Sequence, residues 1–360
     1  MDMFAKIGLG LLCGIVLGFV LQRGRFCVVS AYRDVILVKD NRMFIAVLIA
    51  IAVQSIGVYA LAGLGLIQLT DVPFTWLGAI VGGFVFGWGI VLAGGCATGT
   101  WYRAGEGLLG SWIALFAYML GTVATKSGVL KPAHDALTRH KGGDAFIYTT
   151  LGISPWVLIL LFAALVSLIV WRHLRQPALV VPTLKPRKSG LAHLLFEKRW
   201  HPFVTALLVG IIAIAAWPMS EATGRMFGLG ITTPSGNLLR YITTGDATYL
   251  DWAVFLVLGI ALGSYIAAKG SGEFRWRLPD VKTIRHNFVG GLLMGFGASI
   301  AGGCTIGNGL VNTSLFTWQG WVATLFIIAG TWSATYVVIM RGRRKETAGA
   351  APGQTAPLSM

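Results

Sequence analysis

Charged side chains are scarce in this sequence. Only 12% of its 360 residues are Asp, Glu, Lys or Arg, whereas soluble domains are about 25% charged. The shortage comes from long runs without any charge, at residues 43–66, 75–93, 107–125, 155–171 and 318–340. Each run is about as long as the ~20-residue helix that crosses a bilayer, where a helix satisfies its own backbone polar groups. The sequence therefore predicts an all-α polytopic membrane protein.

Cysteines are also few, and their spacing matches no metal motif. The chain has four: Cys13, Cys27, Cys96 and Cys304. The absence of CxxC pairs and of Cys/His clusters argues against a zinc or iron–sulfur site, so we predict no metal and no cofactor. No Walker motif is present, so we do not expect ATP to drive the chain directly, and we predict that it is not an enzyme.

The apolar runs predict about nine transmembrane helices. An apolar stretch at 7–21 is followed by Gln22-Arg23-Gly24-Arg25 instead of a small-residue cleavage site, so we expect it to be a span rather than a signal peptide. The nine predicted spans are residues 5–22, 43–66, 75–93, 107–125, 155–171, 203–218, 250–268, 288–301 and 318–340.

The charge that is present is mostly basic, with a formal net charge of +15. We expect these residues to anchor cytoplasmic loops rather than to bind nucleic acid. With the N-terminus placed in the periplasm and the C-terminus in the cytoplasm, 22 of the 29 Lys and Arg residues fall on the cytoplasmic side. This bias predicts a multi-pass protein of the bacterial inner membrane in that orientation.

The spans and the segments between them divide the chain into six parts. The linker is marked by Pro177, Pro182 and Pro186 among basic residues, and the tail is rich in Ala, Pro, Gly and Thr. The predicted parts are a first membrane repeat (1–125), a periplasmic loop that includes a surface helix (126–154), a linking transmembrane helix (155–172), a cytoplasmic linker (173–200), a second, inverted membrane repeat (201–340) and a disordered cytoplasmic tail (341–360).

Two segments of the sequence repeat one another. Residues 82–99 read GGFVFGWGIVLAGGCATG and residues 290–307 read GGLLMGFGASIAGGCTIG, which align without a gap at an offset of 208. The predicted topology sends the two copies through the membrane in opposite directions, so we predict two inverted pseudo-symmetric repeats. The span at 288–301 has only about 14 residues, or ~21 Å, so we expect the chain to break there and return as a short re-entrant helix.

The breaks are expected at the paired glycines, which are Gly94, Gly95, Gly302 and Gly303. Cys96 and Cys304 follow these breaks directly, so we expect both thiols to face a cavity. Short helices that begin at such breaks would aim backbone N–H groups at an anion. Cys13 lies within a span and is expected to be a small buried hydrophobe.

Several polar residues near these points are candidates for supporting a pathway or a vestibule. Four of them are either pathway residues or helix caps: Thr98, Thr100, Thr305 and Asn308. Arg103 and Glu106 lie three residues apart, and Glu221 and Arg225 lie four apart. Both spacings predict helical ion pairs, which either stabilise the fold or tune the charge around a vestibule. Arg25, just after the first span, is a further candidate.

The segments QRGRFC (22–27), AGGCATGTWYRAGEG (93–107), EATGRMFGLG (221–230) and AGGCTIGNG (301–309) resemble the YeeE/YedE family of bacterial sulfur-compound transporters, and most of all its thiosulfate importers. The resemblance runs from about residue 7 to 340. It implies a conduction path lined by three cysteines, which correspond here to Cys27, Cys96 and Cys304. It also implies a cytoplasmic partner, a small sulfur-carrier protein of the TusA-like type.

Thiosulfate suits such a path, because it is a dianion with a soft terminal sulfur. A conduction site must hold the ion strongly enough to admit it and weakly enough to release it. A neutral thiol is a weak donor, and a free thiol with a pKa of ~8.5 is mostly protonated at neutral pH. We therefore predict that the three thiols pass the ion along by weak S–H···S hydrogen bonds.

Two other functions remain open at this point. The family includes members linked to selenium, so another sulfur or selenium species is an alternative substrate. A membrane-embedded sulfurtransferase, with a persulfide on Cys96 or Cys304, is an alternative of a different class. A third class, a structural scaffold, would leave the repeated AGGC motif without a role.

Overall fold

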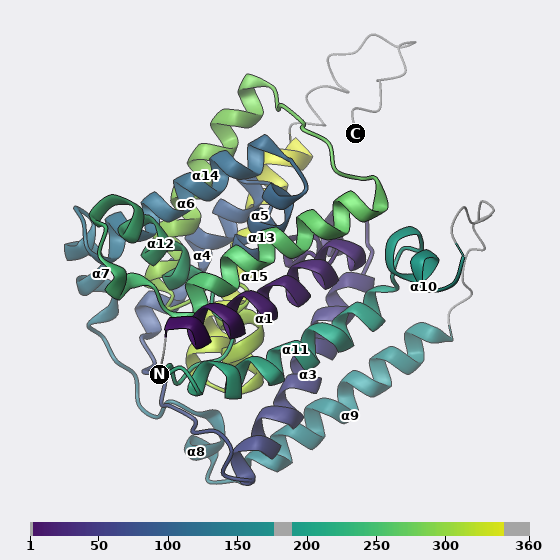
Figure 1. Ribbon diagram of the computed structural model, residues 1–360. Coiled ribbons are helices and arrows are strands. Elements are labelled where there is room, and N and C mark those ends of the chain that lie inside the picture. The colour runs from purple at the N-terminus through teal and green to yellow at the C-terminus, as the bar shows by residue number, and fades with distance from the viewer. Residues whose placement is uncertain (1–2, 176–188, 342–360) are drawn as a thin grey trace.

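The computed structural model describes residues 3–175 and 189–341, and this part of the chain is helical without an extended sheet (Figure 1). Nine of its helices have 17 to 22 residues. They are α1 (Met3–Gly24), α3 (Arg42–Gly63), α4 (Trp76–Leu92), α6 (Leu109–Lys126), α9 (Pro155–Leu174), α11 (Pro202–Glu221), α13 (Trp252–Ser271), α14 (Val281–Ile300) and α15 (Trp318–Ala334). The prediction of an all-α polytopic membrane protein is confirmed.

The number of membrane spans is close to the predicted nine. Among the described residues, seven helical segments are long and apolar enough to cross a bilayer. An eighth is reached if α6 is joined to α7 (Lys131–Thr138), to which it is bent by 68°. Helix α14 is the remaining predicted span, and it carries Lys282 and Arg285 in its first turns, which lower its apolar character.

The predicted short span at 288–301 was wrong in length. Helix α14 begins seven residues earlier, at Val281, and has 20 residues. The side chain of Asp280 caps its first turn by accepting a hydrogen bond from the backbone N–H of Thr283. The basic residues that suggested a loop therefore lie in the first turns of a helix, because the Asp280 cap stabilises its start despite the polar side chains there.

Shorter helices follow the ends of the long ones. Helices α2 (Val28–Leu37) and α5 (Ala97–Gly105) come after α1 and α4, and a π-helical turn, η3 (Gly307–Asn312), comes after α14. Another π-helical segment, η4 (Thr335–Met340), extends α15, and α12 (Thr232–Thr244) and η2 (Ala247–Tyr249) lie between α11 and α13.

The connecting segments are partly ordered into helix. The loop 126–154 contains α7 and α8 (Ile147–Leu151), neither of which has a buried residue, in line with the surface helix expected there. The linker contains α10 (Gly190–Ala192) and η1 (His193–Glu197). Pro177, Pro182 and Pro186, and the predicted tail beyond residue 341, lie outside the described residues.

Close backbone packing joins the two halves of the chain. Helix α1 runs alongside α13, and α3 packs on α11 (Figure 1). At the first crossing, a Cβ on Gly14 would lie 2.1 Å from the carbonyl oxygen of Leu256, and one on Gly263 would lie 2.0 Å from that of Ile15. Small residues allow such approaches between membrane helices, so the high glycine content of the sequence is used at helix crossings. Helices α4, α6, α14 and α15 form a second packed group.

Candidate functional site

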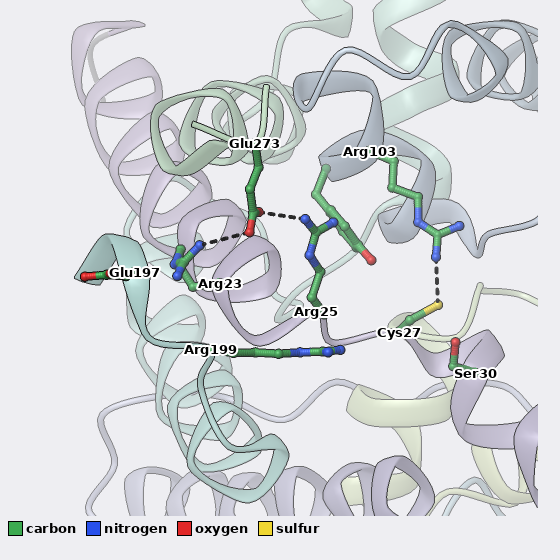
Figure 2. Close-up of a pocket in the computed structure, with 9 residues that line it drawn as sticks. Arg23, Arg25, Cys27, Ser30, Arg103, Glu197, Arg199 and Glu273 are labelled. Carbon is green, nitrogen blue, oxygen red and sulfur yellow. Dashed lines mark hydrogen bonds and ion pairs between the residues drawn. The ribbon is translucent and has the colours of Figure 1, made fainter. Parts of the chain in front are cut away.

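Two cavities lie at the broken helices, and each contains one of the predicted thiols. The first, called here the Cys27 vestibule, has a volume of about 420 Å³. Its lining residues are Arg23, Arg25, Cys27, Ser30, Tyr102, Arg103, Glu197, Arg199 and Glu273 (Figure 2). The second, the Cys304 vestibule, measures about 260 Å³. Its lining residues are Arg225, Phe227, Gly230, Ile231, Thr232, Thr233, Pro234, Gly302, Gly303, Cys304 and Gly307.

The two vestibules draw on opposite sides of the predicted topology. Every residue of the Cys27 vestibule comes from segments that the charge bias places in the cytoplasm: 23–42, 94–106, 172–202 and 269–287. The Cys304 vestibule draws on the loop after α11, the start of α12, the break after α14 and the start of η3, which the same bias places outside. The two cavities therefore have the arrangement expected of the two ends of one path.

Cys96 is buried and lines neither of these cavities. The residue is only 2% exposed, and it is close enough to interact electrostatically with both Cys27 and Cys304. All three thiols are free and buried. The structure thus brings the three predicted residues, which are far apart in the sequence, into one region of the molecule.

Two of the thiols occupy the N-cap position of a short helix. Cys27 precedes α2, and Cys96 precedes α5, where its Sγ accepts a hydrogen bond from the backbone N–H of Gly99 at 3.3 Å. The sequence predicted short helices at the breaks, and α5 meets that expectation. The chain after Cys304 instead forms two turns and then η3.

The glycine breaks have the geometry that only glycine adopts readily. Gly94 has φ +67° and Gly302 has φ +72°, both in the left-handed region. Behind the second break, the Nδ2 of Asn308 donates to the carbonyl oxygens of Ala301 (2.8 Å) and Gly303 (3.0 Å). Asn308 therefore holds the broken backbone in place, which fits the capping alternative for this residue.

The three candidate threonines divide into two kinds. The hydroxyl of Thr100 donates to the carbonyl oxygen of Ala97 at 2.7 Å and so belongs to the turn of α5. The hydroxyls of Thr98 and Thr305 are buried and have no hydrogen-bond partner. Thr305 lies close to the Cys96 thiol. Buried unpaired hydroxyls are uncommon, and these two lie in the segments that directly follow Cys96 and Cys304.

The predicted pair between Arg103 and Glu106 was wrong. Glu106 accepts hydrogen bonds from Nη1 of Arg25 at 2.8 and 3.0 Å, and Arg25 also pairs with Glu273 at 2.7 Å. The Nη2 of Arg103 lies 3.7 Å from the Cys27 sulfur, and its Nη1 donates to the Gly94 carbonyl. Helical spacing could not reveal a partner that is 81 residues away.

The predicted pair between Glu221 and Arg225 was also wrong. The carboxylate of Glu221 accepts a hydrogen bond from the backbone N–H of Gln68 at 3.1 Å. The guanidinium of Arg225 donates to the carbonyl oxygens of Phe227 (3.0 Å) and Gly228 (2.7 Å). The two residues lie on either side of the end of α11, so the helical spacing on which the prediction depended is interrupted.

Sequence reasoning missed Glu273 and Gln22. Glu273 pairs with Arg25, accepts a hydrogen bond from Nε2 of Gln22 at 2.8 Å, and lies 3.8 Å from a guanidinium nitrogen of Arg23. Its only signal was that it is one of two acids in the basic segment 269–287. Across residues 3–175 and 189–341, no group of three or more His, Cys, Asp or Glu side chains is placed to hold a metal.

We expect Glu106→Gln to lower the thermal unfolding temperature of the purified protein. The Glu106 side chain is 5% exposed, and removing its charge leaves the guanidinium of Arg25 partly uncompensated. Thermal unfolding of the single variants and of the double variant Arg25→Gln/Glu106→Gln would give their coupling, which we expect to be about 1 kcal/mol. Purely additive effects of the two substitutions would contradict the pairing.

Comparison with known proteins adds an independent result. The family described as "Sulphur transport" matches residues 23–333. The thiosulfate transporter TsuA of Escherichia coli strain K12 is 55% identical over 343 residues, which is 95% of this chain and 97% of that protein. The thiosulfate transporter TsuA of Spirochaeta thermophila is 36% identical over 346 residues, 92% and 99% of the two chains. The probable transporter YedE of E. coli is 34% identical over 183 residues, 48% of this chain and 43% of that protein.

Proposed function

We propose, from the premise that this chain belongs to the sulphur-transport (YeeE/YedE) family, that it imports thiosulfate across the bacterial inner membrane. The observation that carries the proposal is that Cys27 and Cys304 each line a cavity, while the buried Cys96 interacts electrostatically with both. The names of the two TsuA relatives support the choice of thiosulfate.

The path runs from the Cys304 vestibule past Cys96 to the Cys27 vestibule. Each neutral thiol donates a weak S–H···S hydrogen bond to the terminal sulfur of the ion, and the ion moves on by exchanging one thiol for the next. The unpaired hydroxyls of Thr98 and Thr305 donate to its oxygens in the buried centre, where a charged ion without partners would be strongly disfavoured.

The helix packing supports two repeats within the chain. In the proposed repeats, α1, α3, α4 and α6 of the first half correspond to α11, α13, α14 and α15 of the second half. If each helix is replaced by its counterpart, the contact of α1 with α13 becomes the contact of α11 with α3, which is also present. In the same way, the contact of α6 with α14 becomes the observed contact of α15 with α4, and the contact of α4 with α14 is its own counterpart. The packing of the two halves is therefore the same under this correspondence. We infer that the repeats are inverted in the membrane, with the N-terminus in the periplasm and the C-terminus in the cytoplasm, as the charge bias predicts.

On the cytoplasmic side, a TusA-like carrier is the proposed acceptor of the ion.

Growth on thiosulfate tests the substrate. A bacterial strain without its own sulfate and thiosulfate uptake is supplied with this gene and given thiosulfate as sole sulfur source. We expect growth with the wild-type gene and none with an empty vector. Failure of a well-expressed wild-type protein to support growth would refute thiosulfate import, and uptake of sulfide and of selenium oxyanions would then be measured. A protein-bound persulfide after exposure to thiosulfate would favour the sulfurtransferase alternative instead.

A further inference from the structure

Four arginines line the Cys27 vestibule, and two of them are neutralised. Arg25 pairs with Glu106 at 2.8 Å and with Glu273 at 2.7 Å, and Arg23 lies 3.8 Å from Glu273. Figure 2 shows the Glu273 carboxylate joined to the guanidinium groups of both Arg23 and Arg25. On this side of the vestibule, positive charge is therefore matched by carboxylates.

The other two arginines have no such partner. Within the described part of the chain, no carboxylate lies within ion-pair distance of Arg103 or Arg199. The Nη2 of Arg103 points to the Cys27 sulfur at 3.7 Å, with Ser30 beside that thiol (Figure 2). Arg199 extends across the cavity below Arg25, with its guanidinium directed toward the Cys27 side (Figure 2). The two guanidinium groups without an ion-pair partner thus lie on the Cys27 side of the vestibule.

We infer that Arg103, Arg199, Cys27 and Ser30 form an anion-binding subsite at this end of the path, built for a sulfur oxyanion with one soft sulfur. The subsite deepens the proposed function and rests on it. Guanidinium groups donate paired N–H bonds to the oxygens of such an ion, and the Ser30 hydroxyl adds a donor. The Cys27 thiol meets the terminal sulfur.

The carboxylates have a distinct role in this arrangement. Four free guanidinium groups would hold a dianion firmly, whereas a transport site must also release it. By pairing with Arg23 and Arg25, Glu106 and Glu273 leave Arg103 and Arg199 as the two guanidinium groups of the vestibule without an ion-pair partner among the described residues. The subsite can then attract the ion from Cys96 and still release it at the mouth of the cavity.

The two sides of the membrane provide the test. Uptake of [³⁵S]thiosulfate is measured in right-side-out and in inside-out membrane vesicles, so that the ion meets either the Cys304 or the Cys27 vestibule first. With Arg103→Gln, we expect the half-saturating concentration on the Cys27 side to rise about tenfold, as for loss of one charge-assisted hydrogen bond. On the Cys304 side it should change less than about twofold.

A second variant covers the case that Arg103→Gln disturbs folding, since Arg103 also holds the Gly94 carbonyl. Arg199→Gln should raise the half-saturating concentration about threefold on the Cys27 side only. Lys282→Gln is the matched control, because Lys282 is an exposed cation from the same predicted side, and both concentrations should stay within about twofold.

The outcomes separate the subsite from the proposed function. Side-specific increases with Arg199→Gln, and with Arg103→Gln where that variant folds, both absent with Lys282→Gln, support the subsite. Active wild-type protein with Arg199→Gln unchanged on both sides, or changed equally on both, overturns the subsite and leaves thiosulfate transport standing. Wild-type protein without uptake in either type of vesicle overturns both.

Discussion

Replacing Cys96 with alanine is expected to reduce thiosulfate uptake to the level of vesicles without the protein. Cys96 is the buried thiol that interacts with both Cys27 and Cys304, so alanine removes the one donor for the terminal sulfur of the ion at this step of the proposed path. A dianion without a donor is strongly disfavoured in such surroundings. Initial rates of [³⁵S]thiosulfate uptake, normalised to the amount of protein in the membrane, measure the effect.

Cys13→Ala is the matched control for this substitution. Cys13 is also buried, in α1, but it lines neither vestibule, so its loss removes only a small hydrophobic side chain. We expect uptake by this variant to remain close to that of the wild type. Equal losses from Cys13→Ala and Cys96→Ala, or wild-type uptake by Cys96→Ala, would contradict a path through the thiols.

Replacing Gly14 with leucine is expected to prevent assembly of the folded protein. A Cβ at this position would lie 2.1 Å from the carbonyl oxygen of Leu256, so α1 and α13 could not keep their present contact. The neighbouring Gly18 and Gly263 are equally close to backbone atoms, and the helices therefore have no room to adjust locally. The yield of monodisperse protein after detergent extraction and gel filtration measures the effect, and we expect almost none.

Gly8→Leu tests whether the crossing, rather than leucine in α1, causes that loss. Gly8 lies on the same helix, and a Cβ there would have no atom within 4 Å. We expect a yield near that of the wild type. Comparable yields from Gly14→Leu and Gly8→Leu would show that the close crossing of α1 and α13 is wrong.

The class of the fold could be predicted because apolar runs are long and their physical cause is simple. Residues 43–66 and 155–171 predicted α3 and α9, since an uncharged run of that length must be helical in a bilayer. The Gly-Gly pairs predicted the breaks at Gly94 and Gly302, because left-handed backbone conformations favour glycine. The match to the sulphur-transport family and to proteins named as transporters confirms the family and the prediction of a transporter rather than an enzyme.

The partners of the charged residues could not be predicted in the same way. Arg25 contacts Glu106 and Glu273, which are 81 and 248 residues away, and only the packing of α1 against α13 and α5 brings them together. The three-residue spacing predicted that Arg103 would pair with Glu106. The guanidinium of Arg103 instead contacts the Gly94 carbonyl and the Cys27 sulfur. Sequence patterns thus indicated which residues matter near the breaks, while their contacts depend on tertiary structure.

Transport by the purified protein in liposomes, compared between [³⁵S]thiosulfate and [³⁵S]sulfate, tests the central claim most directly. Both ions are dianions with a tetrahedral sulfur, and they differ in that thiosulfate has a soft terminal sulfur for the thiols of Cys27, Cys96 and Cys304. If the three thiols select the ion by S–H···S contacts, thiosulfate will accumulate in the liposomes and sulfate will remain at the level of protein-free liposomes. Equal uptake of the two ions would contradict selection by these three thiols.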